Sequence, residues 1–135
     1  MSGMSAALRR YINSIGVTST VLPLQHFLDY MIPSGSDVAV TANSAGTQAD
    51  ATVLDATTMW HEVVTVAGAN DGVVLPPARR GEIHFIANQH ATNAIQVFAP
   101  TPDTINAVAT ATGVAQAALT GTLYVCLVDG NYCSF

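Results

Sequence analysis

Residues 62–106 read EVVTVAGANDGVVLPPARRGEIHFIANQHATNAIQVFAPTPDTIN, a series of short apolar runs separated by proline, glycine and asparagine. Apolar and polar residues alternate within the runs, and a period of two residues is that of a β-strand with a buried face. Turn residues recur about every eight to twelve positions, the spacing of antiparallel sandwiches and barrels. This stretch therefore predicts a mainly β domain, folded as an antiparallel β-sandwich or barrel.

The same pattern, followed along the whole chain, places further strands on both sides of this stretch. The expected strands cover about residues 37–41, 60–67, 72–75, 82–87, 93–98, 103–107, 113–119, 121–128 and 131–135. Residues 122–128 are apolar on both faces, so we expect this strand in the centre of a sheet or at a subunit interface.

The first part of the chain differs from the rest. We expect residues 1–50 to form an N-terminal arm and linker, and residues 51–135 to form the β-sandwich domain. The arm carries one or two short helices, within residues 5–16 and 21–33, and the second has apolar residues at helical spacing. An amphipathic helix of about ten residues is unstable alone in water, so its apolar side chains are candidate partner contacts. These side chains are Leu24, Phe27, Leu28 and Met31.

The composition is unusually apolar for a water-exposed domain. Half of the residues are hydrophobic and 10% are charged, against an average near 25% charged, and the mean hydropathy is +0.37. No stretch approaches the roughly 18 apolar residues of a membrane-spanning helix, and no secretory signal is recognised at the N-terminus. We therefore expect a soluble, unprocessed oligomer in which sister subunits cover the apolar surface.

Positive charge is scarce and paired. The chain has a net charge of −5, contains no lysine, and carries its four arginines as Arg9-Arg10 and Arg79-Arg80. Binding to nucleic acid requires a basic surface, so no nucleic-acid partner is expected. Each arginine pair is either a solvated loop or a contact to carboxylates of a neighbouring protein, because guanidinium groups pair well with carboxylates.

The two cysteines, Cys126 and Cys133, flank the turn residues Asp129 and Gly130. A two-residue hairpin loop places the cysteines opposite each other, at a hydrogen-bonded site where side chains are poorly aimed for a disulfide. We favour two buried free thiols over a disulfide bridge.

Residues suited to catalysis do not form a recognisable motif. His26, His61, His84 and His90 are candidate metal ligands, but we favour hydrogen-bonded or surface histidines, because no pair has the spacing of a known site. No nucleophile elbow or nucleotide-binding loop is present, and nothing predicts that Glu62 and Glu82 face each other across a cleft. We therefore expect no catalytic residues, no cofactor and no metal, and we do not expect an enzyme.

The segment DGVVLPPARRGEIHFIANQHATNAIQVFAPTPDTINA, residues 71–107, resembles a module of structural proteins in tailed-phage virions. In that pattern a strand ends in Leu-Pro, a turn reaches a glycine, a strand ends in asparagine, and another leads through an aromatic residue to proline. Asp-Thr-Ile-Asn follows. The matching residues here include Leu75, Pro76, Gly81, Asn88, Phe98, Pro100 and 103–106. Pro102 departs from the pattern, where glycine often stands, and so does Tyr132, where tryptophan is common.

The resemblance implies a virion component assembled in the host cytoplasm from β-sandwich subunits, commonly as trimers. The function it implies is that of a capsid decoration, or cement, protein that binds the major capsid protein and stabilises the head. A head or tail fibre or knob element, and a receptor-binding module that recognises a glycan, remain alternatives. Glycan binding requires exposed aromatic side chains; Tyr124 and Tyr132 are candidates if they face outward, whereas Trp60 is expected to pack in the core.

Overall fold

The computed structural model describes residues 37–45 and 47–135. Several predicted features lie outside these residues: the two arm helices, His26, and the candidate contacts Arg9, Arg10, Leu24, Phe27, Leu28 and Met31. Over the described part, no helix is long and apolar enough to cross a membrane.

The described chain is built from short strands and contains no helix. The strands are β1 (Asp37–Ala45), β2 (Thr52–Val53), β3 (Trp60–Val66), β4 (Asp71–Val74), β5 (Ile83–Asn88), β6 (Ile95–Phe98), β7 (Thr104–Ile105), β8 (Val114–Gln116), β9 (Thr120–Val128) and β10 (Asn131–Ser134). They lie close to the strands predicted from the alternation; β2 was not predicted.

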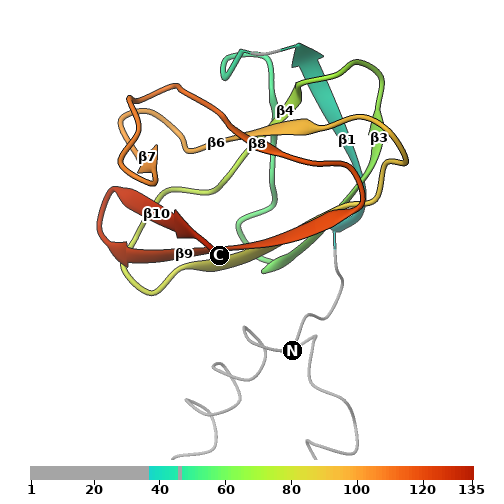
Figure 1. Cartoon of the computed structure of the whole chain (residues 1–135). Helices are drawn as coiled ribbons and strands as arrows, with labels where there is room; N and C mark the ends of the chain where they lie inside the picture. Colours follow the sequence, from blue (N-terminus) through green and yellow to red (C-terminus); the bar gives the residue numbers. More distant parts are fainter. Residues whose placement is uncertain (1–36, 46) are drawn as a thin grey trace, which may run out of the picture.

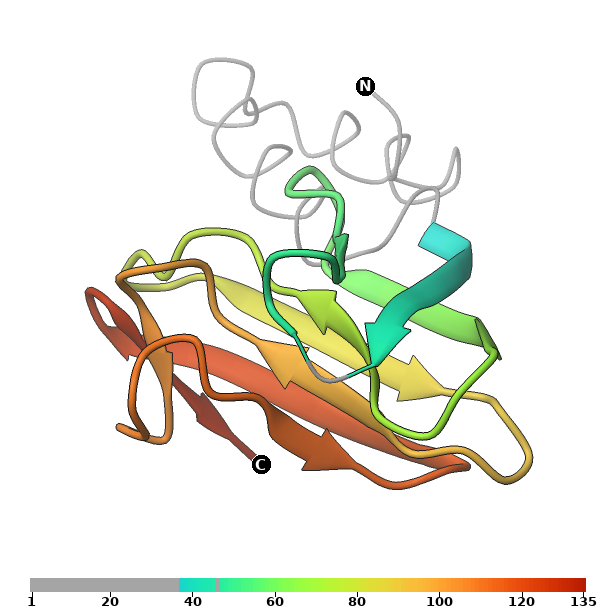
Figure 2. The same cartoon turned by 90° about the horizontal axis from the view of Figure 1, so that it is seen from above.

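The strands wind as a β-solenoid of about four turns (Figures 1 and 2). Strands β1, β3 and β5 are parallel neighbours on one side, where His61 pairs with Ile86. Strands β2, β4 and β6 are parallel neighbours on the other side, where Val73 pairs with Val97. The chain thus passes from one side to the other at each step, and each turn lies beside the previous one.

The expected antiparallel sandwich or barrel is therefore wrong. Alternation tells which side chains point inward, but it does not tell which strand is the neighbour. The prediction assumed that consecutive strands pair as hairpins, whereas the connections 67–70 and 75–82 carry the chain to the opposite side. Strands two apart in sequence become neighbours, and that order makes them parallel.

Antiparallel pairing is concentrated in the last part of the chain. Strand β8 pairs with β6, β9 pairs with β5, and β10 pairs with β9. These strands continue the two sides of the solenoid beyond β5 and β6, so that β5 has a hydrogen-bonded neighbour on each edge.

The core lies between the two sides of the solenoid. Alternate residues of each strand point into it, so that in β5 His84, Ile86 and Asn88 are buried while Ile83, Phe85 and Ala87 are half-buried. The fully enclosed apolar side chains come from six of the ten strands: Val63, Val73, Ile86, Ile95, Val97, Ile105 and Tyr132.

Two buried amides tie β8 and β9 to the parallel part. The Gln116 side chain donates to the carbonyls of Ile86 (2.9 Å) and Thr120 (3.0 Å). The Asn88 side chain donates to the carbonyls of Asn93 (3.0 Å) and Ala117 (3.1 Å). These bonds connect β5, β8 and β9, and they hold the strand ends beside the groove described below.

Candidate functional site

The outward side of β3, β5, β9 and β10 is an apolar surface. Register places Phe85 beside Trp60 on one flank and Leu123 on the other, and Ile83 beside Val125. Phe135 exchanges both backbone hydrogen bonds with Leu123, so its side chain lies on the same side of the sheet. We call this surface the outer face; it comprises Trp60, Val64, Ile83, Phe85, Ala87, Leu123, Val125, Leu127 and Phe135.

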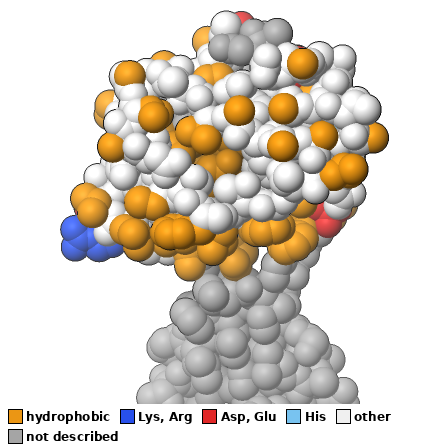
Figure 3. Space-filling view, viewed as in Figure 1, with side chains coloured by type: hydrophobic (Ala, Val, Ile, Leu, Met, Phe, Trp, Pro, Cys, Tyr) orange, Lys and Arg blue, Asp and Glu red, His pale blue; other side chains and the backbone are white. Residues whose placement is uncertain are grey.

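Several of these side chains are well exposed within the described structure. Leu127 is 56% exposed and Phe135 is 72% exposed. Figure 3 shows hydrophobic side chains gathered along the edge of the molecule where β5, β9 and β10 lie. Contiguous apolar surface of this kind marks a site of interaction with another apolar surface.

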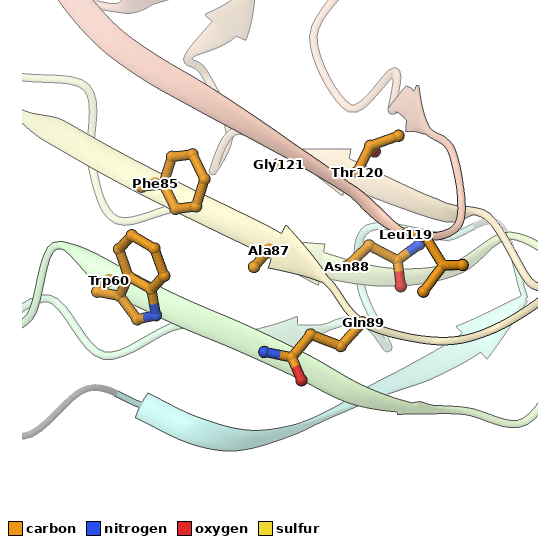
Figure 4. Close-up of a pocket in the computed structure, with 8 residues that line it drawn as sticks. All are labelled: Trp60, Phe85, Ala87, Asn88, Gln89, Leu119, Thr120 and Gly121. Carbon is orange, nitrogen blue, oxygen red and sulfur yellow. The ribbon is translucent and has the colours of Figure 1, made fainter.

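A shallow groove of about 520 Å³ crosses the outer face. Its lining residues are Trp60, Phe85, Ala87, Asn88, Gln89, Leu119, Thr120 and Gly121. Figure 4 shows the two aromatic rings side by side at one end of the groove and Gln89 and Leu119 toward the other, with Ala87 between them. The groove exists because Ala87 and Gly121 are opposite each other in the sheet and are both small.

The aromatic end of the groove is held by specific contacts. The rings of Trp60 and Phe85 stack with their centres 4.4 Å apart, and the Trp60 indole donates to Glu62 Oε1 at 2.9 Å. On its other side Phe85 covers Gly121, where any added Cβ atom would clash with the tip of the ring. The pair is therefore fixed in place before any partner binds.

The polar groups around the groove differ in whether they already form hydrogen bonds within the protein. The Thr120 hydroxyl donates to the Ala117 carbonyl at 2.7 Å, and the Asn88 amide is used as described above. Gln89 is exposed, and its amide points across the groove in Figure 4. Gln89 is thus the groove amide best placed to meet a partner.

Arg79 and Arg80 lie on a turn that leads into Ile83 at the edge of the outer face. The turn is rigid: Arg80 N–H donates to Asp129 Oδ1 at 2.7 Å, and Glu82 N–H donates to the Arg79 carbonyl at 2.9 Å. Both arginines are exposed, and neither guanidinium forms an ion pair among residues 37–45 and 47–135. Figure 3 shows the basic side chains together at one end of the apolar edge.

The three described histidines, His61, His84 and His90, do not belong to the outer face. His61 and His84 are fully buried, with His61 Nε2 3.2 Å from His84 Nδ1. His90 accepts hydrogen bonds from the backbone N–H groups of Thr92 and Asn93 in a loop. In the described ranges, no group of three or more histidine, cysteine or acidic side chains could hold a metal ion.

The remaining predicted residues also take definite positions. Cys126 and Cys133 are free, but the expected pairing is wrong: a bulge shifts the register, so that Cys126 pairs with Tyr132 and Cys133 with Val125. Cys126 is buried whereas Cys133 is half-buried. Glu62 contacts Trp60 and Glu82 contacts His84, so the two glutamates have separate roles.

The aromatic candidates are the reverse of those expected. Tyr124 and Tyr132 are 1% and 0% exposed, so they are core residues rather than sugar platforms. Trp60, expected in the core, lies half-buried on the outer face. The groove residues Phe85, Leu119 and Gly121 were missed. The alternation placed Phe85 with Ile83 and Ala87 on one face of the strand, but it gave no indication that this face points outward.

No family model, no curated protein and no solved structure matches the chain.

Proposed function

We propose that this chain is a structural subunit that packs against other protein subunits through the outer face. The observation that carries the proposal is the continuous apolar outer side of β3, β5, β9 and β10, with Leu127 and Phe135 more than half exposed. In water such a surface favours burial, at about 25 cal/mol per Å².

The outer face contributes to association through its exposed apolar side chains. Fully burying an exposed leucine, isoleucine or phenylalanine side chain contributes about 1.5–3 kcal/mol. Leu127 and Phe135 are more than half exposed and contribute most, whereas Ile83 and Leu123 are already half-buried and contribute less. Their sum is comparable to the lower end of the cost of association, which is on the order of 4–15 kcal/mol. The preformed Trp60–Phe85 pair adds contact area that needs no ordering on binding.

The likeness of residues 71–107 to virion modules supports a particular assembly. We propose a capsid decoration protein, assembled as a homotrimer in the virion, that binds the major capsid protein and stabilises the head. In this role Arg79 and Arg80 contact carboxylates of the capsid protein, and the N-terminal residues extend the contact. The function is then one of binding and mechanical support, without a chemical step.

A charge placed on the outer face tests the assembly. Leu127→Glu should convert the native oligomer into monomers, because it buries an unpaired carboxylate in the interface. Val53→Glu is the matched control, since Val53 is 73% exposed but lies on β2, away from the outer face. Native mass spectrometry at micromolar concentration measures both. A monomeric wild-type protein, or equal assembly of both variants, would contradict the proposal.

Attachment to capsids tests the particular role. The purified protein should add in a fixed stoichiometry to capsids prepared without it, and should raise the temperature at which they release their genome. If the protein assembles with itself but does not add to such capsids, the decoration role is wrong and the more general proposal of a structural subunit remains.

The groove supports a second candidate function, recognition of a glycan. A half-buried aromatic pair beside an exposed amide, here Trp60, Phe85 and Gln89, is a combination that stacks on a sugar ring and hydrogen-bonds its hydroxyls. Binding on a sugar array, lost in Trp60→Ala while the oligomer persists, is the expected result for this function. Absence of any binding on the array would exclude it.

A further inference from the structure

A row of four titratable side chains runs through the protein between Asp37, at the start of β1, and Glu82, just before β5. Asp37 Oδ2 lies 3.6 Å from His61 Nδ1. His61 Nε2 lies 3.2 Å from His84 Nδ1, and His84 Nε2 lies 3.3 Å from Glu82 Oε2. Both imidazoles are fully buried, while the carboxylates reach the surface, with side chains 33% and 28% exposed.

Counting hydrogen atoms shows that two neutral imidazoles cannot satisfy this row. A neutral imidazole has one N–H donor and one acceptor nitrogen. The contact between the two rings uses one N–H, and each carboxylate, which only accepts, requires another. Three donors are needed and two are available. When both rings are neutral, the lone pair of one ring nitrogen must therefore face a carboxylate. The structure agrees with this count, because His61 Nδ1 and His84 Nε2 are buried without a hydrogen bond of good geometry.

We propose that the His61–His84 pair is a binding site for one additional proton, held as a single imidazolium shared between the carboxylates of Asp37 and Glu82. The proton comes from solvent and supplies the missing third donor. A second proton is excluded, because it would place two imidazolium rings with their nitrogens 3.2 Å apart.

The surroundings of the pair favour a single positive charge. Asp55 adds a further negative charge near His61. On the side of β10, Tyr132 presents its ring to His84 at 6.2 Å and donates its hydroxyl to the Pro76 carbonyl. On β9, Tyr124 is the pairing partner of His84, and its hydroxyl donates to Gln116. Asp55 therefore also favours the imidazolium, while both tyrosine hydroxyls donate to other acceptors.

Burial sets the pH range in which the proton binds. Desolvation lowers the pKa of both histidines below the ordinary value, and the neighbouring carboxylates oppose that shift. In the unfolded chain both histidines bind protons near pH 6.5. The unfolded state therefore holds more protons in acid, and the stability of the fold, complete above this pH, decreases as the pH falls through it.

The proton connects two parts of the molecule. Asp37 begins β1 directly after the N-terminal residues, and Glu82 belongs to the arginine turn through its backbone bond to Arg79. Uptake of the proton draws both carboxylates onto the histidine pair. The row thereby makes the position of β1 and of the arginine turn depend on pH.

Nitrogen-15 NMR of the full-length protein tests the proposal directly. The four ring nitrogens are followed from pH 8 down to the onset of acid unfolding. The expected result is uptake of one proton by the pair. Two rings that both stay neutral over the whole range, or two rings that both become imidazolium in the folded state, would overturn the proposal.

Two variants test the role of the carboxylates. Asp37→Asn and Glu82→Gln should each lower the midpoint of proton uptake by one pH unit or more, since each removes an acceptor for the third donor. Asp50→Asn is the control, because Asp50 is exposed and bonds only Thr47 among the described residues. Unchanged midpoints in both variants would overturn the proposal. If a variant does not fold, the titration of the wild-type protein still tests the proposal.

Discussion

At the scale of single residues, an aromatic ring packs over glycines on each side of the solenoid. Phe85 covers Gly121 on the outer face. On the opposite side Phe98 lies between Gly72 and Gly113, where added Cβ atoms would come within 2.7 Å of Phe98 Cε2 and 2.9 Å of Phe98 Cε1. These glycines are required by the close approach of a ring, not by an unusual backbone conformation.

The glycine under Phe98 gives a prediction for stability. Gly72→Ala should lower the free energy of unfolding by about 1–3 kcal/mol, the usual cost of overpacking, because Phe98 is 2% exposed and Ala51 blocks the other direction. Urea denaturation measures the change. Adding Phe98→Leu should recover part of the loss. If Gly72→Ala is as stable as the wild type, the ring does not lie against this glycine.

At the scale of elements, the decisive feature is how the antiparallel β8 and β9 are joined to the parallel strands. Strand pairing provides most of the contact, but Gln116 adds hydrogen bonds to Ile86 of β5 and Thr120 of β9, and accepts one from Tyr124 at 3.2 Å. A single buried amide therefore contacts strands from both parts of the fold.

Replacing the Gln116 amide should weaken the connection of β8 to β5 and β9. Gln116→Met keeps the shape but removes the bonds to the Ile86 and Thr120 carbonyls and the acceptor of the buried Tyr124 hydroxyl, so the free energy of unfolding should fall by about 1–3 kcal/mol. Gln89→Met is the matched control, and as an exposed change it should stay within about 0.5 kcal/mol of the wild type. Chemical denaturation of the two variants side by side checks this, and equal stabilities would show that Gln116 is dispensable.

At the scale of the whole molecule, the proposed function predicts separable roles for the solenoid and the N-terminal residues. Removal of residues 1–34 should leave a folded protein, because the strands and the buried core described above begin at residue 37. The truncated protein should unfold cooperatively by circular dichroism, yet no longer attach to capsids. Attachment at the full-length affinity would remove the N-terminal residues from the proposed contact.

The arginine turn provides a second prediction at this scale. Arg79→Glu combined with Arg80→Glu should weaken attachment without changing the fold, since both side chains are exposed and only the Arg80 backbone bonds to Asp129. The wild-type affinity should fall as salt rises, because exposed charges are screened over about 8 Å at physiological ionic strength. If the charge reversal leaves binding unchanged, the arginine turn is a solvated loop and not a partner contact.

The positions of all the strands except β2 follow from the sequence alone. Alternation of the kind seen in Ile83–Asn88 and the punctuation by proline and glycine are local properties, so they determine where strands begin and end. The arginine turn is also a local feature and lies where it was predicted, whereas the cysteine register was wrong because a bulge shifts β10 against β9.

Only the tertiary structure decided the neighbours of each strand and the direction of each face. Parallel pairing of β3 with β5 depends on corners that send the chain to the opposite side, and these corners have the same residues as hairpin turns. Whether Trp60 or Tyr132 is buried depends in turn on which sheet lies behind it. Long-range packing, which leaves no periodic trace in the sequence, therefore created the outer face and brought His61 beside His84.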